Sequence, residues 1–444
     1  MLKKHTILLL NYLIKNPIRN IVLFGLVLRL FLFIVFYHSV SIFTDTGGYI
    51  ELSKFISSFD LNGYSGLRSL GYPLIIALFF QNLYAIIIFQ FGLGILATIF
   101  WYKSLLNLHF SIRSGFLITI FISSFLNVFF FETSILVEKL VLFMISWIVL
   151  VLSNRIFENL KFSNILLLNF IFGFLVLLKP FYAFFPFLFL ILIVLKGISF
   201  TRFLTSSTVI ILPLFFYFGW CRINEINTGY FAPVSYYGLT TAQNCVYFAE
   251  KSTSEFDWIA KPYVAYREKS IRENKDLAMT IWYAYEDGAY NKYNLTFQQL
   301  SAKLGEFAKI TIKNNPRDYL KQVICRSWFD YWKPTIYWNY DKFNFKYANK
   351  IAFGVWYIQY AILLFFRLFF IVLMPYYFVQ YIENRKVTVV FMLTSIVFLS
   401  SILQAIVTYA DNERFSVPFE FIMIIVVFIF IRDKKWLPTR FNHY

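Results

Sequence analysis

Residues 82–102 read NLYAIIIFQFGLGILATIFWY, a run of 21 residues without a charged side chain. A helix of about 20 apolar residues spans the roughly 30 Å hydrocarbon core of a bilayer. The 444-residue chain is 59% hydrophobic and 22% aromatic, whereas soluble domains contain about 45–50% apolar residues. The excess is concentrated in long runs like this one, so the sequence predicts an all-α polytopic membrane protein.

Reading outward from 82–102 predicts about ten transmembrane helices. The fifth and sixth are short and share a turn at Lys179 and Pro180. The eighth is long and carries Arg367. The predicted spans are 20–40, 82–102, 114–131, 133–153, 164–178, 180–195, 203–220, 351–380, 388–408 and 417–431.

The net charge of +17 is explained by where the basic residues lie. The short connections at one end of the predicted spans hold sixteen Lys and Arg residues, Lys3, Lys4, Arg155, Lys435 and Arg440 among them, against three acidic residues, Glu158, Glu383 and Asp433. The positive-inside rule places these connections and both termini in the cytoplasm. We therefore expect a multi-pass protein of the plasma or inner membrane that does not bind nucleic acid. The amino terminus lacks a small-residue cleavage site, so we expect no removable signal peptide.

Three segments then face outward: 41–81, 221–350 and 409–415. The sequence predicts a transmembrane module over 1–220 that includes the first outer loop, an extracytoplasmic domain over 221–350, and a second transmembrane module over 351–444. Periodic apolar positions predict that the middle domain is mainly helical, with helices in 276–290, 294–314 and 316–332; Pro316 would begin the last one. The segment contains Cys221, Cys245 and Cys325. They are compatible either with one disulfide and one free thiol or with three free thiols.

Outward-facing chemistry falls to carboxylates, because 221–350 contains no histidine, which excludes a Ser-His-Asp or Cys-His site there. Asp45 follows the first span directly. It either caps the next helix or acts as a general base whose proton affinity is raised by partial desolvation; the two roles are compatible. Glu138 and Lys139 lie inside the fourth span, where charges are costly and are functional candidates by default. They also fit a mutually satisfied ion pair.

Four cations lie at the outer boundary: Arg68, Lys179, Arg222 and Arg414. Cations at this depth suit a phosphate group. Together with Asp45 they predict a pocket for an anionic lipid.

Five stretches carry a resemblance to a known family. They are Arg29-Leu30, Asp45 to Tyr49 with the run LRSLGYP at 67–73, Glu138-Lys139-Leu140, Leu178-Lys179-Pro180, and Glu413-Arg414-Phe415 with Pro418. Their order and spacing resemble the GT-C membrane glycosyltransferases, in particular the protein O-mannosyltransferases and lipid A aminoarabinose transferases. Those enzymes transfer a sugar from a polyprenyl-phosphate carrier on the outer face of the membrane. The resemblance covers most of 20–240 and 405–432.

The resemblance implies a GT-C-like fold, and it also implies roles for individual residues of the matching motifs. Asp45 would be the general base of an inverting transfer, with Glu138 orienting the base or the acceptor. Arg68, Lys179 and Arg414, with Arg222, would bind the donor phosphate. Tyr49, Tyr72 and Glu413, within the matching motifs, would line the substrate pocket. The partners would be a polyprenyl-phosphate sugar and a lipid, glycan or protein acceptor.

We expect no metal site, although the resemblance leaves a divalent cation open. The commoner family pattern has a second acidic residue directly after the Asp, and this chain has Thr46 there.

Two alternative functions remain. A polyprenyl-linked glycan polymerase or ligase relies on outer-loop Arg and His, and the outer loops here lack His. A lipid-linked glycan transporter or flippase would place polar residues or broken helices at mid-membrane. The polar residues here gather mostly at one face, which favours catalysis at the boundary.

Overall fold

The computed structural model describes residues 12–154 and 161–434. Every regular element in this part of the chain is a helix, and the one isolated β-bridge pairs Ser41 with Ser134. The prediction of an all-α protein is confirmed. Lys3, Lys4, Arg155, Glu158, Lys435 and Arg440, which entered the prediction of sidedness, lie outside the described residues.

Within the described residues, six helical segments are long and apolar enough to cross a membrane, and each matches a predicted span. Their bounds are Pro17–Phe36 (α2 and η1), Leu83–Asn107 (α5), Phe200–Thr228 (α11, η3 and α12), Ala348–Asn384 (α19), Val389–Val407 (α20) and Asn412–Asp433 (α21, η9 and α22). A seventh is added if α6 (Ile112–Ser123) and α7 (Leu126–Glu132), which meet at a bend of 59°, form one span.

The other three predicted spans are shorter helices in the structure. They are α8 (Glu138–Ser153), α9 (Phe162–Leu178), and η2 with α10 (Pro180–Leu195). Sixteen or seventeen helical residues rise about 24–26 Å, which is at the lower limit for crossing a bilayer. The structure therefore supports six or seven spans, and the count of ten stays a prediction.

Helix α8 lies at the centre of the bundle. All of its residues except Trp147 and Leu150 are buried, and it packs against α5 and α9. At the periphery, α2 exposes Leu23, Val27 and Leu30. A contiguous apolar stripe on an outer helix is exposed at little cost where the solvent is lipid. The burial pattern thus fits a bundle embedded in a membrane.

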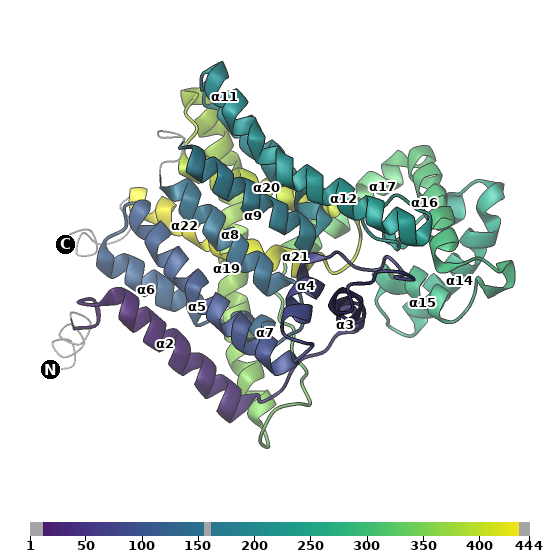
Figure 1. Ribbon diagram of the computed structural model, residues 1–444, viewed down its shortest axis with the longest axis horizontal. Coiled ribbons are helices and arrows are strands. Elements are labelled where there is room, and N and C mark those ends of the chain that lie inside the picture. Colours follow the sequence, from purple (N-terminus) through teal and green to yellow (C-terminus); the bar gives the residue numbers. More distant parts are fainter. Residues whose placement is uncertain (1–11, 155–160, 435–444) are drawn as a thin grey trace.

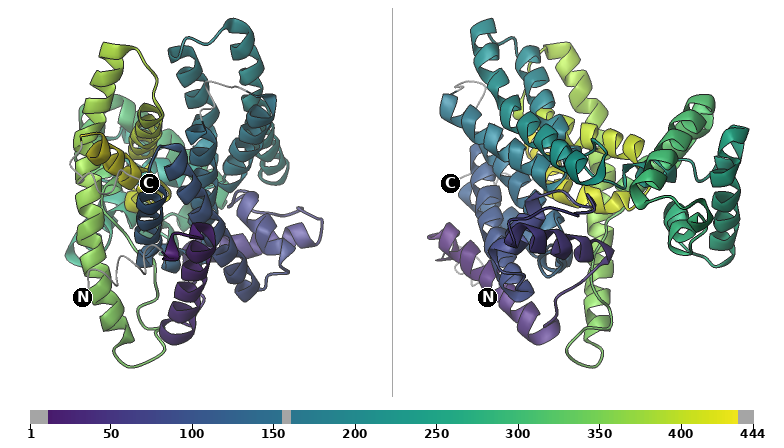
Figure 2. Two further views of the ribbon diagram at one scale, coloured as in Figure 1. Left: turned by 90° about the vertical axis from the view of Figure 1, so that its left-hand side faces the viewer. Right: turned by 45° about the vertical axis from the view of Figure 1, so that its right-hand side comes forward.

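A second hydrophobic core forms outside the bundle, and Figure 1 shows its helices gathered on the right, away from α2 and α22. It is built by α13 (Tyr237–Gln243), α14 (Asp257–Arg272), α15 (Thr280–Glu286) and α16 (Phe297–Asn314) around Leu239, Tyr263, Leu304 and Phe307. The right-hand view of Figure 2 shows the same group projecting from the bundle. Helix α16 begins with a capping box of Thr296 and Gln299, which satisfies backbone N–H groups at its first turn.

The chain returns from this second core to the bundle through α17 (Pro316–Gln322), η8 (Val323–Ser327) and α18 (Trp328–Tyr331). The α17 helix has Pro316 at its first position, as predicted. Tyr331 and Trp332 pack into the core of the bundle, and Tyr331 Oη donates to Ser400 Oγ. Residues 328–343 therefore belong with the bundle in packing, although they follow the outer helices in sequence.

The first outer loop forms two helices, α3 (Thr44–Ser57) and α4 (Gly71–Leu78), which pack against each other. Gly71 lies against α9: a Cβ at Gly71 would stand 2.7 Å from the carbonyl carbon of Leu177. Glycine is required for this close approach. It brings the loop that ends at Leu70 to the end of α9, where Lys179 lies.

Candidate functional site

Five of the predicted site residues, from four separate parts of the chain, meet in one charged cluster. Asp45 contacts two arginines: its Oδ1 lies 3.0 Å from Arg68, and its Oδ2 lies 2.8 Å from Arg414. The same Arg414 donates from Nε to Glu138 Oε1 at 2.7 Å, and Lys179 Nζ lies 3.8 Å from that oxygen. We call Asp45, Arg68, Glu138, Lys179 and Arg414 the rim cluster.

Asp45 is held at the start of α3 by its neighbour Thr46. The Thr46 hydroxyl accepts from the backbone N–H of Phe43 and donates to the carbonyl of Ile135. These bonds fix the beginning of α3 against the segment that leads into α8. The N-cap of α3 is Phe43, and Asp45 lies inside the first turn, so the capping role considered for Asp45 is wrong. Its carboxylate contacts Arg68 and Arg414 instead.

Arg68 reaches Asp45 because Gly48 leaves room for it. A Cβ at Gly48 would stand 2.7 Å from Arg68 Nε. The guanidinium lies between two rings, 5.2 Å from the centroid of Tyr49 and 5.5 Å from that of Tyr236. Cation–π contacts of this kind fix the orientation of an arginine, and the charge of Arg68 is paired with Asp45.

The other cations come from the ends of helices. Lys179 follows the last residue of α9 and lies 3.3 Å from the ring centroid of Phe415. Arg414 belongs to α21 and lies 5.4 Å from the ring of Tyr337. Glu138 is in the first turn of α8, where a carboxylate is favoured by the helix dipole.

Exposure divides the rim cluster into two layers. The side chains of Asp45, Arg68 and Lys179 are 27%, 18% and 24% exposed, whereas those of Glu138 and Arg414 are 3% and 9% exposed. A ligand would therefore meet Asp45, Arg68 and Lys179 first. Glu138 holds Arg414 in place from beneath, through two hydrogen bonds of 2.7 and 3.2 Å.

The electrostatics of Asp45 differ from the expectation that its proton affinity is raised. Burial does act in that direction, but Arg414 and Arg68 outweigh it and hold the pKa of Asp45 at about 2. The carboxylate is thus firmly ionised and paired. Burial, with Arg414 adding to it and Glu138 opposing both, lowers the pKa of Lys179 to about 8. With Lys179 protonated, three cations face two carboxylates, so the rim cluster carries one net positive charge.

Of the remaining predicted residues, the structure places Tyr49 against the rim cluster and leaves out Arg222, Glu413 and Tyr72. Arg222 is 65% exposed and pairs with Glu225, one turn further along α12. Glu413 makes none of the ion pairs of the rim cluster among the described residues. Tyr72 is fully buried and donates to Gln90 Oε1, which makes it part of the packing. Tyr49, whose ring packs edge-on against Tyr72, lies beside Arg68 as described.

Sequence reasoning missed Tyr236 and Tyr337, which contact Arg68 and Arg414. Both lie in the long segment 221–350, where no short motif marks them. It also considered Glu138 and Lys139 as a pair. In the structure they diverge, because neighbouring residues on a helix point about 100° apart.

Lys139 belongs instead to a buried triad with Arg29 and Glu132. Arg29 donates to both Glu132 carboxylate oxygens at 2.7 Å, and Lys139 Nζ contacts Glu132 Oε1. All three side chains are at most 5% exposed. Gly94 of α5 makes the space, since a Cβ there would stand 2.0 Å from Glu132 Oε1.

Among residues 12–154 and 161–434, no group of three or more His, Cys, Asp or Glu side chains is placed to hold a metal ion. All three cysteines are free thiols, with Cys325 exposed and the other two buried. Comparison with protein-family models, curated proteins and solved structures finds no match to this chain. The resemblance to GT-C glycosyltransferases therefore rests on the five motifs and on nothing else.

Proposed function

We propose that the protein is a membrane glycosyltransferase that moves a sugar from a polyprenyl-phosphate donor to an acceptor on the extracytoplasmic face. The observation that carries the proposal is the rim cluster, in which Asp45 meets Arg68 and Arg414 beside Lys179. Converging Arg and Lys side chains bind a phosphate through charge-assisted hydrogen bonds, and a carboxylate next to them can serve as the general base of the transfer. The rim cluster supplies both.

In the proposed reaction the donor phosphate engages Arg68, Lys179 and Arg414. The acceptor hydroxyl oxygen then forms a bond to the anomeric carbon as the bond from that carbon to the phosphate oxygen breaks. The hydroxyl proton passes to Asp45, and the electron pair of the broken bond leaves with the phosphate. The configuration at the anomeric carbon is inverted, and the three cations stabilise the charge on the departing phosphate.

The low pKa of Asp45 in the free protein fits this scheme in one specific way. A carboxylate paired with two arginines is a weak base. When the donor phosphate takes over contacts of Arg68 and Arg414, Asp45 loses part of its stabilisation and gains a nearby negative charge. Both changes raise its proton affinity, so the base becomes active only when donor is bound.

The transporter alternative would draw on the triad of Arg29, Glu132 and Lys139, which are charges inside the helix bundle. Those charges are joined to each other and fully enclosed, as expected for a structural ion cluster. The rim cluster differs because three of its members reach solvent.

The experiment that tests the proposal is turnover of radiolabelled polyprenyl-phosphate sugars by the purified protein. Asp45→Asn removes the base and should abolish sugar release, with normal expression and membrane insertion. Asp60→Asn is the matched control, since Asp60 lies in the same outer loop and its carboxylate only accepts from the Asn62 backbone. Wild-type turnover by Asp45→Asn would refute the role of the base, and absence of turnover with every donor would refute the function.

A further inference from the structure

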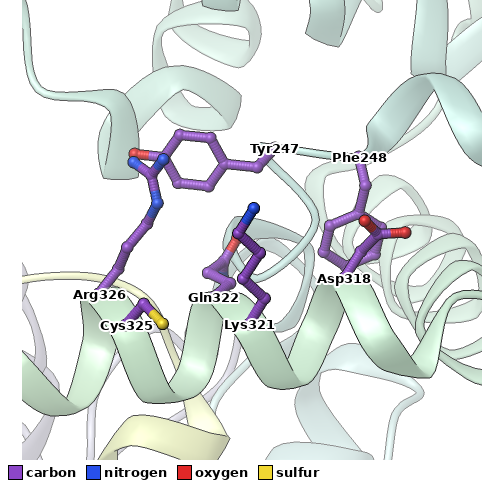
Figure 3. Close-up of a pocket in the computed structure, with 7 residues that line it drawn as sticks. All are labelled: Tyr247, Phe248, Asp318, Lys321, Gln322, Cys325 and Arg326. Atoms are coloured by element: carbon purple, nitrogen blue, oxygen red, sulfur yellow. The ribbon is translucent and has the colours of Figure 1, made fainter.

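A cavity of about 540 Å³ lies outside the rim cluster, between the segment that contains Tyr247 and Phe248 and the helical turns α17 and η8. Figure 3 shows the residues that line it: Tyr247, Phe248, Asp318, Lys321, Gln322, Cys325 and Arg326. Five of the seven come from consecutive turns of one helical segment. The last two belong to a π-helical stretch, Val323–Ser327, a rare widening of a helix that often occurs at functional sites.

The lining presents two uncompensated cations. Within the described residues, neither Lys321 nor Arg326 forms an ion pair, whereas Asp318 is neutralised by Lys251 at 2.7 Å. Both basic side chains project from the helix toward the Tyr247–Phe248 segment (Figure 3). The Arg326 guanidinium lies 3.5 Å from the ring centroid of Tyr247. A guanidinium stacked in this way is fixed in orientation and keeps its N–H edge free for an oxyanion.

Gln322 supplies a second, independent indication of a ligand. The residue is 2% exposed, and neither its Oε1 nor its Nε2 has a hydrogen-bond partner. An unsatisfied buried amide is destabilising, so such groups are rare unless a ligand or water completes them. A sugar hydroxyl can do so, because it both donates to the carbonyl oxygen and accepts from the amide.

Two hydrogen bonds tie the segments around the cavity to the loop that leads to Arg414 of the rim cluster. The hydroxyls of Tyr247 and Tyr409 lie 3.1 Å apart. The Asn412 side-chain amide donates to the carbonyl of Ser327, the residue after Arg326, at 3.1 Å. Tyr409 and Asn412 lie just before Arg414 in the chain, so the loop that carries Arg414, a predicted phosphate-binding residue, also contacts the segments that surround the cavity.

We propose that this cavity binds an acidic saccharide unit, a sugar bearing a carboxylate or phosphate group. Its oxyanion would pair with Lys321 and Arg326, and its hydroxyls would satisfy Gln322. Given the proposed function, this unit would belong to the acceptor. The cavity would then select an anionic glycan and hold it beside the transfer site.

Cys325 provides a direct test. It is the exposed thiol in the lining, and the other two cysteines are buried, so a maleimide added to the folded, full-length protein reports on the cavity. We expect glucuronate and glucose 1-phosphate to slow the labelling of Cys325 severalfold. Glucose, and chloride at matched ionic strength, should leave the rate unchanged. The protection factor is taken within each variant, because charge changes also alter thiol reactivity.

The variants Lys321→Gln and Arg326→Gln should each lose most of the protection. Lys261→Gln is the matched control, since Lys261 is an exposed lysine of the outer helices that pairs with Asp257. Protection by inorganic phosphate equal to that by the acidic sugars would show a plain anion site and overturn the saccharide assignment. Absence of protection, or equal protection by glucose, would refute the proposal. The assay involves no sugar transfer, so its outcome is independent of donor turnover.

Discussion

Gly94→Ala tests the buried triad of Arg29, Glu132 and Lys139. A Cβ at position 94 would stand 2.0 Å from Glu132 Oε1, 2.5 Å from an Arg29 guanidinium nitrogen and 2.8 Å from Lys139 Nζ. To reach ordinary van der Waals contact, the Glu132 oxygen would have to withdraw by more than 1 Å and the two cationic nitrogens by less than 1 Å, movements that the packed bundle resists. Leaving a buried charge without its partner costs about 3–5 kcal/mol, so we expect a destabilisation of this order.

Gly92→Ala is the matched control, since a Cβ at Gly92 meets nothing within 4 Å and the residue lies on the same helix, α5. In the interior of a helix, alanine is more favourable than glycine by roughly 0.5–1 kcal/mol. The two substitutions should therefore shift stability in opposite directions. The measurement is denaturant unfolding of both variants in detergent micelles. Equal effects of Gly94→Ala and Gly92→Ala would refute the argument that Gly94 is required for the triad.

Two further predictions concern the rim cluster. Burial lowers the pKa of Lys179 to about 8, so its positive charge is present below that pH and lost above it. The donor KM of the wild type should therefore rise as pH increases through about 8, whereas the KM of Lys179→Arg should change less. Identical pH profiles would contradict the role of Lys179. Arg222→Ala should leave the donor KM unchanged, because the Arg222 side chain is exposed and paired with Glu225; a large rise in KM would show that the site extends to Arg222.

The composition of the rim cluster could be predicted from the sequence because membrane topology limits where charges can lie. Asp45, Arg68, Lys179 and Arg414 were each placed at one boundary of the bilayer, and a thin boundary brings distant residues together. Arg222 met the same criterion, but its helix continues to Thr228 and the side chain pairs along that helix.

Other features were not predictable because they depend on contacts between distant segments. Tyr236 reaches Arg68 only because the outer loop and α13 are held together, by bonds such as Ser235 N–H to the Gly66 carbonyl. The pKa of Asp45 depends on the relative size of two opposing effects. Burial alone predicts a raised pKa, and only the position of the two arginines shows that charge pairing outweighs burial. Helix α8 is likewise shorter than the predicted span 133–153, because it begins only at Glu138.

The central claim is that Asp45 and the basic residues form a site for the phosphate of a lipid carrier, and binding of polyprenyl phosphate tests it most directly. If Asp45 and Arg68 were only a structural ion pair, removing either would weaken binding alike. In a phosphate site, Asp45 competes with the ligand for the arginines. We predict that Asp45→Asn binds polyprenyl phosphate about tenfold more tightly than the wild type, a change of about 1.4 kcal/mol, whereas Arg68→Ala binds it more weakly. Weaker binding by both variants, or equal binding of uncharged polyprenol, would contradict the account.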